Sequence, residues 1–381
     1  MRVIGMPILR RYIKLLIAAV ALICMIVPSS GKAGAEAVKL ELTLEAAIKM
    51  ALETNLEVKK ADMDLRIAQE DRQDALDGYQ QAESALPRVD GYFVYDPNNA
   101  LTKAAESAYY GYLAAQAQVE IKEKQMQIAE DKVVNTARSK YYAVVKAQKA
   151  LAAAKSSAAQ MEEQFRIARA KFAAGVITRL EMTQAEQSWR QAEAGVTKAE
   201  NDLEQAYRAL NIYIGLPSNE RPVLEQNMKM EKIEEISDMD AYIRGLLAQD
   251  PLLWQSQRNV DLQKTLSTQY GSDNEKAELK IDQARLAVDQ YRQTIEETIP
   301  NIYSNIRNLE AQYEAVNTAL AVAKNNAKTA TLRYQLGMVT QAEILTAEAA
   351  VSQLEQQLAE IVVSHELLKN NLEKPWAAVS I

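Results

Sequence analysis

The chain has 381 residues, which is enough for two or three domains, and carries a net charge of −7. An acidic chain is a poor candidate for nucleic-acid binding, and only 3 Phe and 3 Trp argue against a dense aromatic core. With 12 Gly and 9 Pro among abundant Ala, Glu, Gln, Lys and Leu, the composition is typical of long helices or coiled coils.

Residues 1–35 have the three parts of a signal peptide. A basic segment precedes an unbroken apolar run at 15–27, too short for a comfortable membrane span, and small residues follow it. A cleavage site fits residues 33–35, and a membrane anchor that is kept is the alternative. The single cysteine, Cys24, follows Ile23 and not a small residue, so it does not fit a lipoprotein site. We therefore expect an exported, more acidic mature chain without thiol, disulfide or lipid.

A short segment near the middle of the chain is repeated near its end. KFAAGVITRLEMT, residues 171–183, matches RYQLGMVTQAEIL, residues 333–345, at an offset of 162 (333 minus 171). A position-by-position match over this length indicates an internal duplication. The matched positions include Gly175 with Gly337, Thr178 with Thr340, and Glu181 with Glu343.

Long helical patterns flank both copies of this turn. Residues 101–174 and 275–336 lead into the turns, and residues 180–214 and 342–374 lead out of them. Apolar residues recur every seven positions in all four stretches, mostly large on one seam position, with alanine frequent on the other. Because this pattern survives the offset of 162, we expect two antiparallel coiled-coil hairpins. The first seam before the first turn consists of Val144, Leu151, Ala158, Phe165 and Phe172.

A second repeat lies upstream, at an offset of 195 (237 minus 42). LTLEAAIKMALETNLEV, residues 42–58, corresponds to SDMDAYIRGLLAQDPLL, residues 237–253. Each predicts a short helix with Thr43 or Asp238 as its N-cap, followed by a break and a longer helix. The two offsets differ by 33 residues (195 minus 162), and residues 82–106 are the expected place for this extra chain. Only there do we expect strand character, near residues 88–95.

These patterns predict an all-α protein made of two tandem repeats of long antiparallel coiled-coil helical hairpins. We expect a signal peptide at 1–35, a first repeat at 36–214, a linker at 215–235 and a second repeat at 236–381. The linker contains two prolines and has room for short strands or loops.

The repeated order of short helix, broken helix, long helix, Gly turn and returning helix resembles TolC-like outer membrane efflux proteins. The resemblance covers residues 40–375. It is carried by LTLEAAIKMALETNLEV, ESALPRVDGYF, RIARAKFAAGVITRLEMTQAE, ALNIYIGLP and ATLRYQLGMVTQAEILTAEAA. The family implies a homotrimer whose long helices form a hollow tube, or α-barrel, in the cell envelope. It also implies a periplasmic adaptor (membrane fusion) protein, an inner-membrane ABC or RND pump, and outward transport of solutes.

One feature departs from the family pattern. Family members insert a pair of barrel strands into each repeat, whereas this chain has only VDGYFVY at 89–95 and no alternating run within residues 264–280. We therefore expect little or no β-barrel and no stable insertion into a bilayer. Location in the outer membrane is what the resemblance implies, and the missing strands speak against insertion there.

The turns supply the candidate site residues. Glycine fits the left-handed position that ends a helix, so Gly175 and Gly337 are expected in any helical hairpin. The resemblance adds that both glycines and their neighbours contact the adaptor, and that Glu181 and Glu343 line the narrow inner end of the channel. Thr178-x-x-Glu181 and Thr340-x-x-Glu343 also fit capping boxes, which alone explain both acids. The expected adaptor contacts are Ala174, Gly175, Val176, Leu336, Gly337 and Met338.

No set of residues predicts catalysis, a metal or a cofactor. His365 takes the seam position that Leu203 has in the first copy, so we expect it in the core and not as a ligand. A mature chain with one His and no Cys lacks the ligands of a zinc site, and no phosphate-binding Gly-Lys loop is present. The alternative to an export duct is a secreted coiled-coil scaffold of the cell envelope. Two matched turns favour the duct, because a spacer does not need them.

Overall fold

Helices dominate the computed structural model, which describes residues 41–225, 230–270 and 275–378. The predicted signal peptide, Cys24 and residues 226–229 of the predicted linker lie outside these residues. The first repeat contains α2 (Leu44–Thr54), α3 (Leu56–Ser84), α4 (Ala100–Ala173) and α5 (Arg179–Ile214). The second contains α6 (Met239–Gln249), α7 (Pro251–Tyr270), α8 (Glu275–Gln335) and α9 (Gln341–Glu373), followed by the 3-10 turn η1 (Pro375–Ala377).

The helix boundaries repeat as the sequence predicts. The ends of α4 and α8, and the starts of α5 and α9, each differ by 162 residues. Both ends of α2 and α6, and the starts of α3 and α7, differ by 195. The all-α prediction of two tandem helical hairpins is therefore confirmed.

Local hydrogen bonds start and stop the short helices at the predicted residues. The side chains of Thr43 and Asp238 accept hydrogen bonds from the third residue that follows them, as N-caps do. Asn55 starts α3 by accepting from the Glu57 N–H at 2.7 Å. Asp250 starts α7 by accepting from two backbone amides, at 2.8 and 3.0 Å.

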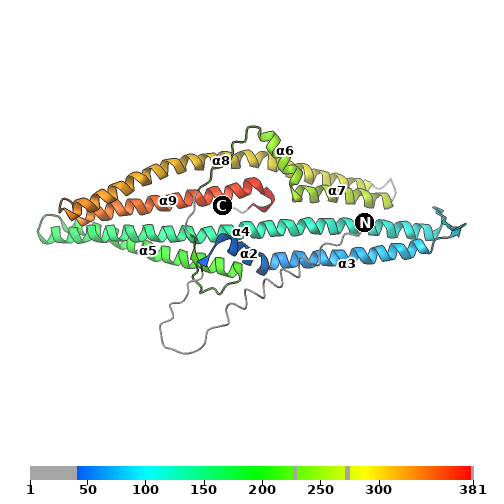
Figure 1. Cartoon of the computed structure of the whole chain (residues 1–381), viewed down its shortest axis with the longest axis horizontal. Helices are drawn as coiled ribbons and strands as arrows, with labels where there is room; N and C mark the ends of the chain where they lie inside the picture. Colours follow the sequence, from blue (N-terminus) through cyan, green and yellow to red (C-terminus); the bar gives the residue numbers. More distant parts are fainter. Residues whose placement is uncertain (1–40, 226–229, 271–274, 379–381) are drawn as a thin grey trace, which may run out of the picture. The chain divides into compact units, whose positions relative to one another are not determined.

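The long helices pack side by side. Figure 1 shows α3 and α5 along one side of α4 and α9 along the other, and these helices are in contact. The helices α8 and α9 pair in the same way, and α7 lies against both α8 and α4. The helix α8 continues through Pro300. None of the described helices is both long enough and apolar enough to span a membrane.

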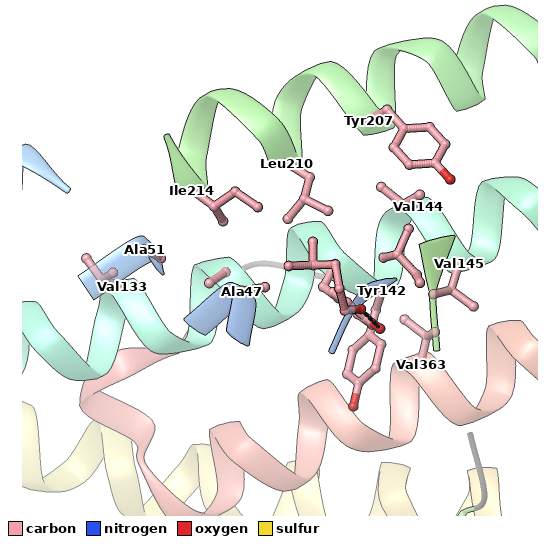
Figure 2. Close-up of a cluster of buried hydrophobic side chains, with 14 of the residues drawn as sticks. Ala47, Ala51, Val133, Tyr142, Val144, Val145, Tyr207, Leu210, Ile214 and Val363 are labelled. Carbon is pink, nitrogen blue, oxygen red and sulfur yellow. Dashed lines mark hydrogen bonds between the residues drawn. The ribbon is translucent and has the colours of Figure 1, made fainter. Parts of the chain in front are cut away.

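A buried core joins α2, α4, α5 and α9 near the middle of α4. Figure 2 shows Val144 and Val145 of α4 in one buried cluster with Leu210 of α5 and Val363 of α9. Alanines of α2 complete the contact, which explains why the sequence places small residues there. The core residues drawn and labelled are Ala47, Ala51, Val133, Tyr142, Val144, Val145, Tyr207, Leu210, Ile214 and Val363.

Two pairs of short strands accompany the helices, one at residues 88–95 and one that includes the predicted linker. The expected strand near residues 88–95 is a hairpin of β2 (Arg88–Val89) and β3 (Tyr92–Phe93). A second pair joins β1 (Glu41–Leu42) to β4 (Val223–Leu224) in parallel, so strand character is not confined to residues 88–95. The buried Tyr141 hydroxyl holds this pair, since it lies 3.0 Å from both the Leu42 carbonyl oxygen and the Glu225 amide nitrogen.

The extra 33 residues of the first repeat lie only in part at residues 82–106. They lengthen α3 to 29 residues against 20 in α7, and α4 to 74 residues against 61 in α8. The rest forms the loop between α3 and α4, which carries β2 and β3. At 1.5 Å per residue, α4 is about 110 Å long.

Candidate functional site: the paired helical turns

Both turns have the same backbone geometry. Gly175 and Gly337 each have a φ of 69°, a left-handed conformation in which other residues are strained. The amide of the residue after each glycine bonds back to a carbonyl five residues earlier, Val176 to Lys171 and Met338 to Arg333, both at 2.9 Å. These are the bonds of a Schellman motif, which satisfies the last carbonyls of a helix.

The two turns lie at the same end of the described helices. The helices α4 and α9 run antiparallel, and side-chain contacts between them continue toward the turns. The Ser156 and Ser352 hydroxyl oxygens are 2.8 Å apart, and the Gln160 amide donates to the Thr346 hydroxyl at 3.2 Å. Figure 1 accordingly shows the α4–α5 and α8–α9 turns next to each other.

Apolar side chains beside the glycines are exposed at both turns. Val176 is 70% exposed, Leu336 is 75% exposed and Met338 is 69% exposed. Ala174 is exposed as well, and no atom lies within 4 Å of a β-carbon built on either glycine. Each turn therefore presents a small apolar surface with open space around it, the kind of surface that often marks a contact site.

The capping box predicted at the first turn is confirmed. The Thr178 hydroxyl accepts from the Glu181 amide at 3.3 Å, and the Glu181 carboxylate accepts from the Thr178 amide at 2.7 Å. The Thr178 hydroxyl also donates to this carboxylate at 2.8 Å. The bond from the Thr178 amide, followed by the bond from its hydroxyl, lowers the pKa of the Glu181 carboxyl from its usual value. The carboxylate is thus held at the start of α5.

The capping box predicted at the second turn is wrong. The Thr340 side chain makes no capping hydrogen bond. The Glu343 amide bonds instead to the Thr340 backbone oxygen at 3.1 Å, so the donor that a capping box requires is already used. Glu343 lies in a groove of about 450 Å³ between α8 and α9 near the turn, which is otherwise lined mainly by alanines such as Ala330 and Ala347.

An ion-paired carboxylate ties the two hairpins together farther along the helices. Glu355 of α9 lies 2.9 Å from the Lys324 ammonium of α8 and 3.5 Å from that of Lys149 on α4. The hydrogen bond from Lys324, helped by Lys149, lowers the pKa of the Glu355 carboxyl. The turns are therefore positioned by contacts between the hairpins as well as by the two Gly reversals.

His365 is in the core, as expected from its seam position, and it has acidic neighbours. It is fully buried, and its Nε2 and Nδ1 atoms lie 3.5 Å from Glu310 and 3.6 Å from Glu366. The Glu310 carboxylate also accepts from the Ile233 amide at 2.9 Å and from Arg307 at 2.6 Å. This cluster joins α8, α9 and the segment before α6. Nothing in the sequence indicated Glu310, because it neighbours a seam residue without occupying the seam.

Within residues 41–225, 230–270 and 275–378, no group of three or more His, Cys, Asp or Glu side chains is arranged to hold a metal ion. The candidate site consists of the two turns with their exposed apolar residues, with one carboxylate fixed in a cap and the other facing a groove.

Comparisons with known proteins show what this arrangement is similar to. Residues 106–216 match the family model described as outer membrane efflux protein. No curated protein sequence matches the chain. The resemblance to TolC-like outer membrane efflux proteins is confirmed, by sequence over these residues and by fold over most of the chain.

Several solved outer membrane channels share the fold at low sequence identity. The outer membrane protein VceC from Vibrio cholerae is 14% identical with a TM-score of 0.60, and the match covers 88% of this chain and 96% of VceC. The CmeC outer membrane channel of Campylobacter jejuni is 14% identical, with a TM-score of 0.58 and 93% of each chain covered. The open state of the Neisseria gonorrhoeae MtrE outer membrane channel is 15% identical, with a TM-score of 0.56, and 93% and 98% are covered.

Proposed function

We propose that this protein is the exit duct of a tripartite efflux or secretion system. In this proposal the two Gly turns dock an adaptor protein, and solutes pass outward through a tube built from three copies of the chain. The adaptor connects the duct to an inner-membrane pump of the ABC or RND kind. Similarity to outer membrane efflux proteins, in sequence over residues 106–216 and in fold over most of the chain, supports the transport role and the assembly into trimers.

One observation carries the proposal. Two hairpins that are far apart in the sequence turn at the same end, and both display exposed apolar residues beside a Gly reversal (Figure 1). Covering exposed apolar side chains removes them from water, which contributes about 25 cal/mol per Å² of buried area before the costs of ordering them are subtracted. A coiled-coil scaffold has no need for two such surfaces, so the duct accounts for more of the structure.

The two acids are assigned different roles in this proposal. The resemblance places Glu181 and Glu343 at the narrow end of the channel, where carboxylates attract cations and repel anions. Glu181 is already bonded within its capping box, whereas Glu343 makes no such bond and faces the groove between α8 and α9. We therefore assign the selectivity of the narrow end mainly to Glu343.

The proposal is tested by photo-cross-linking in the host cell. A photoreactive residue at Met338 should form a product with an adaptor protein, and the same residue at Ile212, an exposed apolar position on α5, should not. Deletion of the gene should raise the retention of exported dyes, and the intact gene should restore it. Two results together would contradict the assignment: normal export by cells that lack the gene, and no adaptor product in cells that carry the photoreactive residue at position 338.

A further inference from the structure

The loop at the opposite end of α4 from the Gly turn carries a second exposed apolar surface. We define the aromatic tip as residues 88–95, which contain β2, β3 and the two residues after them. Val89 is 62% exposed and Tyr92 is 80% exposed, although they face each other as a cross-strand pair. Phe93, Val94 and Tyr95 are 36%, 38% and 54% exposed.

The aromatic tip has a defined conformation. Asp90 and Gly91 both have positive φ values, 52° and 85°, as a two-residue type I′ hairpin turn requires. The Val94 amide donates to the Pro87 carbonyl at 2.9 Å, which fixes the strand end. Leu86, directly before the tip, is only 4% exposed and anchors it to the helices. The exposed side chains are therefore displayed on a built hairpin.

Tyrosines continue from the tip onto the helices beneath it. The rings of Tyr79 on α3 and Tyr109 on α4 are 5.3 Å apart, and Tyr109 is 42% exposed. The Tyr79 and Tyr95 hydroxyls both donate to Glu83, at 2.8 and 3.4 Å. Tyrosine and other amphipathic aromatic residues favour the boundary between water and lipid headgroups, because one end of the ring is apolar and the other is polar.

The charges of the tip select among possible partners. Glu83, Asp90 and Asp96 are acidic, while Arg88 is stacked 4.4 Å from the centre of the Phe93 ring. Carboxylates beside aromatic rings disfavour a polyanion or an anionic lipid surface. The ammonium group of a zwitterionic phospholipid fits this surface better. It can pair with the carboxylates and make cation–π contacts with the faces of the aromatic rings.

We propose that the aromatic tip binds the headgroup layer of a zwitterionic phospholipid bilayer. The contact is peripheral: Tyr92 and its neighbours enter the interface, while α3 and α4 remain in water. The tip is about 110 Å along α4 from Gly175, by the rise of a helix, so this contact and docking at the Gly turns use separate surfaces. The inference goes beyond the proposed function and does not depend on it.

A local fluorescent reporter tests this inference in the full chain. Tyr92→Trp is mixed with vesicles of phosphatidylcholine and phosphatidylethanolamine, with and without bromine on the upper part of the acyl chains. The unchanged chain, with Trp189, Trp254 and Trp376, gives the background. Met338→Trp is the matched control, since position 338 is also exposed but lies in the turn between α8 and α9, at the other end of the long helices. Because the reporter is local, vesicle binding through another part of the chain does not quench it.

We expect brominated lipid to quench the added fluorescence at position 92 and not at position 338. Adding Val94→Asp to the Tyr92→Trp chain should weaken the partition into vesicles about tenfold, because it places a charge in the interface. High salt should leave the quenching in place, since the contact is mainly apolar. No quenching at position 92, equal quenching at both positions, or quenching lost in high salt would each overturn the inference. Circular dichroism confirms that each variant keeps its helices.

Discussion

Replacing the exposed apolar residues of both turns by aspartate should abolish adaptor binding without unfolding the protein. Val176 and Met338 are 70% and 69% exposed, so the free protein loses almost no core contact. Exposed substitutions of this kind change the free energy of unfolding by about 0.5 kcal/mol or less. The variant Val176→Asp with Met338→Asp should therefore keep the helix content and melting temperature of the wild type.

The effect on the complex is much larger. Complete burial of a Val or Met side chain contributes about 1.5–3 kcal/mol, and two residues that are already one-third buried would contribute about 2–4 kcal/mol together. Each unpaired carboxylate in the apolar contact adds a desolvation cost of about 1–3 kcal/mol. A loss of about 4 kcal/mol of binding free energy raises the dissociation constant about a thousandfold.

The assay is the affinity of the purified chain for its cognate adaptor, measured by surface plasmon resonance. Two controls accompany it. Val176→Ile with Met338→Leu keeps the turns apolar and should bind normally, and Ile212→Asp places the same charge on an exposed site of α5. Wild-type affinity in the double aspartate variant would refute the reasoning, and the turns would then be structural inheritance from the duplication.

Three further predictions concern the parts that hold the turns in place. Thr178→Ala should lower the free energy of unfolding by about 1 kcal/mol, whereas Thr340→Ala should cost clearly less in denaturant titrations, because only Thr178 makes a side-chain cap. His365→Leu should change stability by less than about 1.5 kcal/mol, while Glu310→Ala should cost about 1–3 kcal/mol more, because it removes a buried carboxylate that accepts from the part-buried Ile233 amide and from Arg307. Glu355→Gln should cost at most about 1 kcal/mol at pH 7, because the side chains of Glu355 and Lys324 are 34% and 54% exposed. The pKa of Glu355 is lowered in the fold, so its contribution should be present above the carboxyl's usual pKa and vanish as the pH falls through the folded pKa.

The sequence predicted the elements that depend on local signals. These signals are the heptads, N-caps such as Thr43 and the two reversing glycines. Each depends on residues that are close together in the sequence, so it can be recognised without knowing the three-dimensional structure. The hairpin at residues 88–95 also had a local signal, because Asp90-Gly91 between apolar residues is typical of a type I′ turn. The strand character expected there resolves into two strands, and the second strand follows that dipeptide directly.

Features that depend on distant contacts could not be predicted in this way. The pairing of β1 with β4 joins residues about 180 positions apart and is held by Tyr141, whose hydroxyl carries no sequence signal. Glu310 is buried because His365, Arg307 and a backbone amide meet it in three dimensions. The missing cap at Thr340 shows a different limit: the sequence motif is present, but a backbone bond takes the amide that it needs.

The most direct test of the account is an electron cryomicroscopy structure of the full chain with its adaptor. We predict three copies of the chain around a central channel, with the turns at Gly175 and Gly337 of each copy in contact with the adaptor. Monomers or open filaments, or an adaptor bound away from both turns, would contradict it.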